Sequence, residues 1–118
     1  ENNLDLNKTR FLIMGFSFKE NTSDIRNTKI NDIFNILEKK GIKVDVMDPL
    51  CSKSQVKQLY GIDLIEPEMG IYDGILLAVP HDKIIMNGIK NIKSLCKNKK
   101  IIFDLKSAFT EDNDFYRL

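Results

Sequence analysis

Short apolar runs alternate along this sequence with segments in which apolar residues recur every three or four positions. Residues 9–15 (TRFLIMG) are an apolar run ending in glycine, and residues 42–49 (IKVDVMDP) alternate apolar and polar positions up to an Asp-Pro pair, so both ranges predict strands. Between them, residues 28–41 predict a helix that Asn27 or Thr28 caps and that the glycine at its end terminates. The apolar positions of this helix are Ile30, Ile33, Phe34, Ile36 and Leu37.

The alternation continues towards the end of the chain. It predicts a polar helix over residues 52–61, a buried strand over 72–80, an amphipathic helix over 88–98 and a last strand over 100–106. We expect Val56, Leu59 and Tyr60 to be the inward side chains of the polar helix. Strands that alternate with helices favour a parallel sheet covered on both faces, because parallel neighbours need crossover connections. The predicted fold is a Rossmann-like, three-layer α/β domain with a mostly parallel, doubly wound sheet.

This fold predicts where a ligand binds. In open α/β sheets the ligand lies beyond the carboxyl ends of the strands, near the point where the strand order reverses. The segments expected at this edge are residues 15–29, 48–52, 79–83 and 104–109. The first of them has only Gly15 where a dinucleotide fingerprint needs G-x-G-x-x-G, so the loop does not predict a dinucleotide site of that kind.

The side chains of these segments suggest a phosphate-bearing ligand. Cations that could converge on a phosphate are Lys19, Arg26 and Lys106. Phe16 and Phe18 could flank a base or a sugar ring. In the alternative interpretation, one phenylalanine packs in the core while the loop cations pair with Glu20 and Asp24, and residue spacing does not decide between the two.

The histidine and the cysteines offer little catalytic chemistry. Side chains adjacent in sequence rarely point at one another, so we favour His81 as a loop or helix-start residue over a dyad with Asp82, which we expect to serve as a cap. No histidine or lysine in the immediate neighbourhood of Cys51 indicates a lowered thiol pKa. Cys96 falls on the apolar side of its predicted helix, which indicates a core position. We therefore predict no catalytic residue and no metal ligand.

Bulk properties describe one ordinary domain. The chain has 118 residues, 42% of them hydrophobic and 30% charged, and its net charge of +1 favours neither nucleic acid nor acidic membranes. Two distant cysteines indicate neither a zinc site nor a disulfide framework, and no apolar run approaches the ~18 residues of a membrane span. We expect a cytoplasmic protein in which residues 1–8 are a connector from a missing upstream region and residues 9–118 form the domain.

Residues 14–29 (MGFSFKENTSDIRNTK) resemble the opening of the C-terminal, UDP-binding domain of the UDP-glucose/GDP-mannose dehydrogenase family. The similar pattern is G-x-x-F-K-x-x-T-x-D-x-R, which runs here from Gly15 to Arg26. DVMDP, YDGILLAVPHDKI, IIFDLKSAF and the closing YRL also resemble this domain in the same order, so the resemblance extends from Thr9 to Leu118. The VPHDK and DLK forms look most similar to members that oxidise UDP-N-acetylhexosamines.

The resemblance implies an NAD-dependent oxidoreductase that converts the C6 alcohol of a UDP-sugar to a carboxylate for polysaccharide biosynthesis. In the family, the NAD-binding domain and the region with the nucleophilic cysteine precede this domain, and the enzymes are commonly homo-oligomers. By position, Phe18 and Lys19 then contact the nucleotide sugar, Lys106 supplies a second substrate-contacting cation, and Arg26 faces the NAD. Residues 9–118 would be the UDP-sugar-binding domain, inactive alone.

Two further interpretations remain open from the sequence. One is a stand-alone nucleotide-binding or regulatory module that never joins a dehydrogenase. The other is a domain that mainly mediates packing, because its ligand site is half built without the rest of the enzyme. Within the family resemblance, Thr22 and Asp24 are expected to brace the opening loop rather than to bind the ligand.

Overall fold

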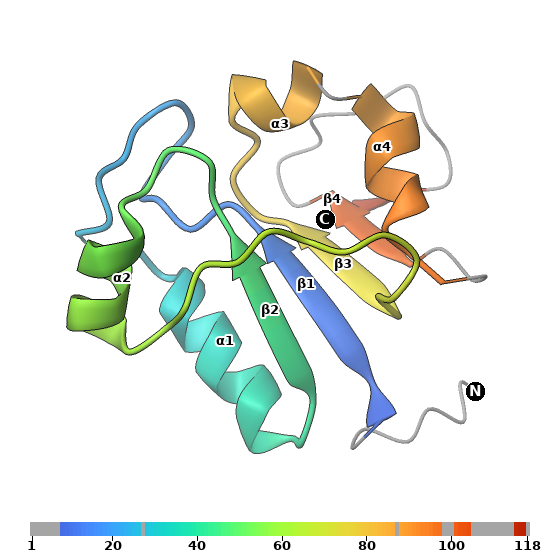
Figure 1. Cartoon of the computed structure of the whole chain (residues 1–118), viewed down its shortest axis with the longest axis horizontal. Coiled ribbons are helices and arrows are strands. Elements are labelled where there is room, and N and C mark those ends of the chain that lie inside the picture. Colours follow the sequence, from blue (N-terminus) through green and yellow to red (C-terminus); the bar gives the residue numbers. More distant parts are fainter. Residues whose placement is uncertain (1–7, 27, 87, 98–100, 105–114, 118) are drawn as a thin grey trace.

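A computed structural model shows one parallel sheet with helices on both faces (Figure 1). The structure describes residues 8–26, 28–86, 88–97, 101–104 and 115–117. The strands are β1 (Arg10–Met14), β2 (Lys43–Met47), β3 (Gly74–Leu77), β4 (Ile102–Asp104) and β5 (Phe115–Arg117), in the spatial order β2-β1-β3-β4-β5 with every neighbouring pair parallel. The helices are α1 (Ile30–Lys39), α2 (Lys53–Tyr60), α3 (Asp82–Met86) and α4 (Gly88–Ser94).

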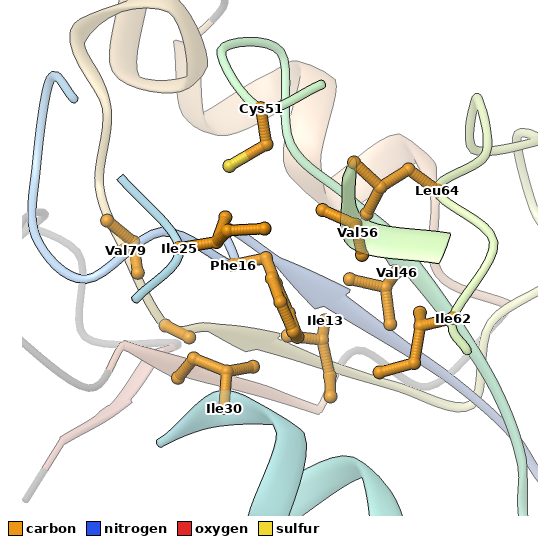
Figure 2. Close-up of a cluster of buried hydrophobic side chains, with 11 residues drawn as sticks. Ile13, Phe16, Ile25, Ile30, Val46, Cys51, Val56, Ile62, Leu64 and Val79 are labelled. Atoms are coloured by element: carbon orange, nitrogen blue, oxygen red, sulfur yellow. The ribbon is translucent and has the colours of Figure 1, made fainter. Parts of the chain in front are cut away.

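Alternating side chains divide the core between the two faces of the sheet. On one face, Leu12 and Met14 of β1 pack with Ile84 of α3 and Ile92 of α4. On the other face, Ile13 lies in a second cluster that includes side chains of α1 and α2; Figure 2 shows its labelled members, Ile13, Phe16, Ile25, Ile30, Val46, Cys51, Val56, Ile62, Leu64 and Val79. The predicted three-layer, doubly wound architecture is confirmed.

The predicted strands and long helices are present, and two short elements were missed. Residues 100–106 were expected to supply the last strand, whereas β5 follows β4 and adds a further strand at the sheet edge. Helix α3 was also not predicted. Elements of three and five residues carry too little periodicity to be recognised from a hydrophobic pattern.

Two apolar side chains of the predicted helices are exposed, and one of them, Leu59, was expected to face inward. Ile36 is 55% exposed because it lies off the stripe that the other apolar residues of α1 form along one side of the helix. Leu59 of α2 is 61% exposed, while Val56 one turn earlier is fully buried. Tyr60, the third expected inward residue, is partly buried, and its hydroxyl donates to the carbonyl of Ile25 at 2.6 Å.

Helix α1 begins two residues later than predicted. Its N-terminal flanking residue is Lys29, which makes no side-chain capping bond. The hydroxyl of Thr28 nevertheless accepts the Ile30 amide at 3.2 Å and donates to the carbonyl of Phe16 at 2.7 Å, so it ties the start of α1 to the loop after β1. The expected stop at Gly41 is consistent with its φ of 89° just after the helix.

Gly15 lets the end of β1 pass close to the segment after β3. Its φ is 98°, and its amide donates to the carbonyl of Met47 at 2.8 Å. A Cβ at this position would lie 2.6 Å from Val79 Cβ and 2.6 Å from the Val79 carbonyl oxygen. A side chain therefore has no room where the strand order reverses, which is the edge that carries the candidate site.

Replacing Gly15 with alanine should lower the free energy of unfolding by about 3 kcal/mol. Two costs add up: the strain of a non-glycine residue at a positive φ, and the overlap of the new Cβ with Val79. Gly61→Ala is the matched control: Gly61 has a φ of 71°, but nothing lies within 4 Å of an added Cβ, so the loss should be about 1 kcal/mol. Urea denaturation of the purified chain measures both. Equal losses would contradict the close approach at Gly15.

Candidate functional site

The carboxyl ends of the neighbouring strands β2, β1 and β3 bring distant segments together, as predicted. Asp48 follows β2, His81 follows β3, and both contact the loop that begins after β1. Of the fourth expected segment, residues 104–109, the structure describes only Asp104, which is fully buried. The candidate site therefore comprises the loop of residues 15–26 and the groups that hold it.

Asp48 is the centre of this arrangement. Its carboxylate is fully buried, and its Oδ2 atom lies 2.8 Å from Nε2 of His81. The same carboxylate accepts backbone amides at 2.7–3.2 Å from Phe16, Ser17, Leu50 and Cys51. Burial alone would raise the pKa of this carboxyl, but the hydrogen bonds from His81 and the amides outweigh it and hold the pKa at about 2. Asp48 is therefore a charged structural group.

His81 is equally buried and immediately precedes α3, which agrees with its expected place in a loop or at a helix start. Its carbonyl accepts the amides of Ile84 and Ile85 in the first turn. Its Nδ1 atom lies 2.8 Å from the backbone nitrogen of Asn21, so the imidazole links the loop after β1 to Asp48. Asp82 is the first residue of α3 rather than the cap before it, and its amide donates to Asn21 Oδ1 at 2.9 Å.

Both cysteines are buried. Burial, together with the charge and hydrogen bond of Asp48, raises the pKa of the Cys51 thiol to about 12, so it stays protonated near neutral pH. Cys96 is buried in the core cluster beside α4. Among the residues that the structure describes, no group of three or more histidine, cysteine or acidic side chains could hold a metal ion.

The two phenylalanines of the loop have different roles. Phe16 is fully buried and stacks edge-on against Tyr60, with ring centroids 5.2 Å apart. Phe18 is 52% exposed. The alternative interpretation is thus correct for Phe16, which belongs to the core, and only Phe18 can face a ligand.

The two loop cations also differ. The guanidinium of Arg26 pairs with Asp24 at 3.1 Å, as the alternative interpretation expected, although the Arg26 side chain is 82% exposed. This pairing raises the pKa of Arg26 and lowers that of Asp24. Lys19 is exposed, and within the described residues its ammonium group forms no ion pair. Lys19 is therefore the loop cation that is free to meet a ligand, whereas Lys106 lies outside the described residues.

Thr22 and Asp24 brace the loop, as expected. The hydroxyl of Thr22 accepts the Asp24 amide at 3.2 Å, and the carboxylate of Asp24 accepts the Arg26 amide at 2.9 Å. The carbonyl of Asp24 accepts the amide of Phe18 at 2.7 Å, which closes the loop on itself. Phe18 and Lys19 are thus carried by a loop with internal hydrogen bonds.

Two hollows flank the loop. A cavity of about 360 Å³ lies between the end of β2 and α3; its lining includes Met47, Asp48, Lys53, Leu64, Lys83 and Ile84. A more open hollow of about 540 Å³ lies beside Arg26; it is lined by residues 22–26 and by Gln55, Gln58 and Leu59 of α2. Neither Phe18 nor Lys19 lines these two hollows, and both side chains are exposed.

The polar network behind the loop was missed from the sequence. His81 was compared only with its neighbour Asp82, whereas its partner, Asp48, is 33 residues away. Ser17 was not considered, although its amide and hydroxyl both join the network. A usable signal existed: each of these polar residues follows an apolar strand closely, and parallel strands end at the same edge of the sheet.

Replacing Asp48 with asparagine should lower the free energy of unfolding by roughly 2 kcal/mol at pH 7, since a carboxylate with a lowered pKa stabilises the folded state above its unfolded pKa. The difference in the free energy of unfolding between wild type and variant should shrink as the pH falls from about 4 to about 2, because the wild-type carboxyl becomes protonated in this range. Urea denaturation at several pH values measures it, with the exposed Glu38→Gln as control. A deficit that is constant down to pH 2 would contradict a charged Asp48.

Comparison with known proteins agrees with this geometry. A family model described as the UDP-glucose/GDP-mannose dehydrogenase family, UDP binding domain, matches residues 12–111. A UDP-N-acetyl-D-glucosamine 6-dehydrogenase of Pseudomonas aeruginosa is 44% identical over 92% of this chain and 26% of its own length. A UDP-N-acetyl-D-glucosamine 6-dehydrogenase of Salmonella typhi is 39% identical over 91% of this chain and 25% of its own length. Protein CapL of Staphylococcus aureus is 39% identical over 85% of this chain and 24% of its own length.

The chain therefore spans about a quarter of the length of the relatives it matches. The family match covers most of the sheet, both core clusters and the loop of residues 15–26. The resemblance noted in that loop is thereby confirmed. This chain belongs to the UDP-glucose/GDP-mannose dehydrogenase family, in which it corresponds to the UDP-binding domain.

Proposed function

We propose that this chain binds the UDP part of a sugar nucleotide within an NAD-dependent UDP-sugar 6-dehydrogenase. The observation that carries the proposal is the exposed pair Phe18 and Lys19, which a braced loop presents at the carboxyl edge of the sheet. The match to a UDP-binding domain supports it, as do the names of the relatives from Pseudomonas aeruginosa and Salmonella typhi. A UDP-N-acetylhexosamine is accordingly the substrate that we propose.

The two side chains suit different parts of this ligand. The exposed ring of Phe18 can stack on a base or sugar, and the ammonium of Lys19 can donate to the pyrophosphate or to a sugar oxygen. Lys106 is proposed as a second substrate-contacting cation. The inert Cys51 and the buried Cys96 offer no nucleophile, so the chemical step is assigned to a region outside this sequence.

Arg26 is proposed to face an NAD bound mainly by another domain. Its guanidinium is exposed and oriented by Asp24, and the loop lacks the glycine-rich turn with which a chain holds a dinucleotide itself. NAD, when bound, supplies the hydride acceptor. The complete enzyme is proposed to be a cytoplasmic homo-oligomer that serves polysaccharide biosynthesis; no helix in the described part of this chain is long and apolar enough to span a membrane.

Replacing Lys19 with alanine should weaken binding of UDP to this chain about 5- to 150-fold, since a charge-assisted contact contributes about 1–3 kcal/mol. Isothermal titration calorimetry with UDP measures the change. Lys40→Ala is the matched control, because Lys40 follows the C-terminus of α1 at the opposite edge of the sheet. Equal affinities of the two variants would refute a direct role of Lys19.

The chain alone should not reduce NAD when it is given UDP-N-acetylglucosamine, because it carries the substrate contacts without a reactive thiol. Absorbance at the wavelength of the reduced cofactor measures turnover. Robust turnover by the purified chain would overturn the proposed division between this domain and the rest of the enzyme. UDP binding without turnover is the expected combination.

A further inference from the structure

The partners of His81 determine which of its ring nitrogens carries the proton. The backbone nitrogen of Asn21, 2.8 Å from Nδ1, can only donate a hydrogen bond, so Nδ1 must be the acceptor and carries no proton. Nε2 lies 2.8 Å from the carboxylate of Asp48, which can only accept, so Nε2 must be the donor. Both contacts are satisfied together by one species, the neutral imidazole with its proton on Nε2.

The contact at Nδ1 holds one end of the turn that carries Phe18 and Lys19. At the other end of the turn, the amide of Ser17 donates to Asp48 at 3.1 Å. The hydroxyl of Ser17 lies 3.2 Å from Nε2 of His81 and donates to the carbonyl of Lys19 at 2.8 Å. Asn21 has a φ of 60°, a left-handed conformation that needs support from its surroundings, and the contact with Nδ1 supplies part of that support.

We propose that His81 is a positioning residue: its neutral ring holds the turn of residues 17–21 through Nδ1 and thereby presents Lys19 to the ligand. This inference rests on the proposed function, in which the turn meets a phosphate-bearing ligand. A protonated Nδ1 would place an N–H group against the N–H of Asn21, so the contact that fixes the turn would become repulsive.

The tautomer can be observed directly, because His81 is the only histidine in the chain. A long-range 1H–15N correlation spectrum of the uniformly 15N-labelled chain contains a single imidazole. At pH 7.5 we expect the spectrum to show that Nε2 is protonated and that Nδ1 is unprotonated. Protonation of Nδ1, either as the other tautomer or as the imidazolium, would overturn the proposal at this pH.

Two substitutions separate the contact at Nδ1 from the contact at Nε2. The amide oxygen of His81→Asn takes the place of Nδ1 and can still accept from Asn21, whereas the amide nitrogen of His81→Gln takes the place of Nε2 and can still donate to Asp48. With UDP as the probe at pH 7.5, we expect His81→Asn to bind within about threefold of wild type and His81→Gln about tenfold more weakly. The reverse order would show that the Asp48 contact matters and would refute the proposal.

Amide hydrogen exchange at Asn21 keeps the test independent of ligand binding. Exchange should be faster in His81→Gln than in His81→Asn or in the wild type. If the wild type does not bind UDP, the proposed function fails, while the tautomer and the Asn21 exchange rates still decide whether His81 holds the turn. Unchanged exchange in His81→Gln would refute it.

Discussion

One buried carboxylate connects the segments on which this site depends. Asp48 carries its charge where the ends of β1 and β2 meet the start of α3, with its side chain removed from water. A buried charge is costly unless hydrogen bonds compensate for the lost hydration. Here the donors come from the loop after β1, from the turn after β2 and from His81 after β3. The charge is therefore stabilised only when all three segments lie in their native positions.

This arrangement separates structural charges from charges that can bind a ligand. The inner group consists of Asp48 and His81, which hydrogen-bond to each other. The charge of Asp48 also helps to keep the nearby Cys51 thiol protonated and unreactive. The outer group consists of Lys19 and Arg26 on the exposed side of the loop, of which Arg26 is oriented by an acidic neighbour. Such a division suits the proposed function, in which this domain binds and orients a phosphate-bearing ligand and another region supplies the reactive groups.

Much of the fold and part of the site could be predicted because their signals are local. The apolar runs of β1, β2 and β3 and the spacing within α1 follow directly from burial of one face or both. The motif from Gly15 to Arg26 was sufficient to indicate the family. Burial of Phe16 and exposure of Phe18 could not be predicted, since both are aromatic residues in the same loop and only the packing of Tyr60 distinguishes them.

The sequence by itself determined the alternation of the longer strands and helices and the edge of the sheet at which the loops after β1, β2 and β3 meet. Only the tertiary structure decided which polar residues meet at that edge. His81 and Asp48 are 33 residues apart, and their contact exists because β2 and β3 run parallel on either side of β1 and end at the same level. Hydrophobic periodicity specifies which faces are buried, but the pairing of polar groups depends on the register and direction of strands that are distant in sequence.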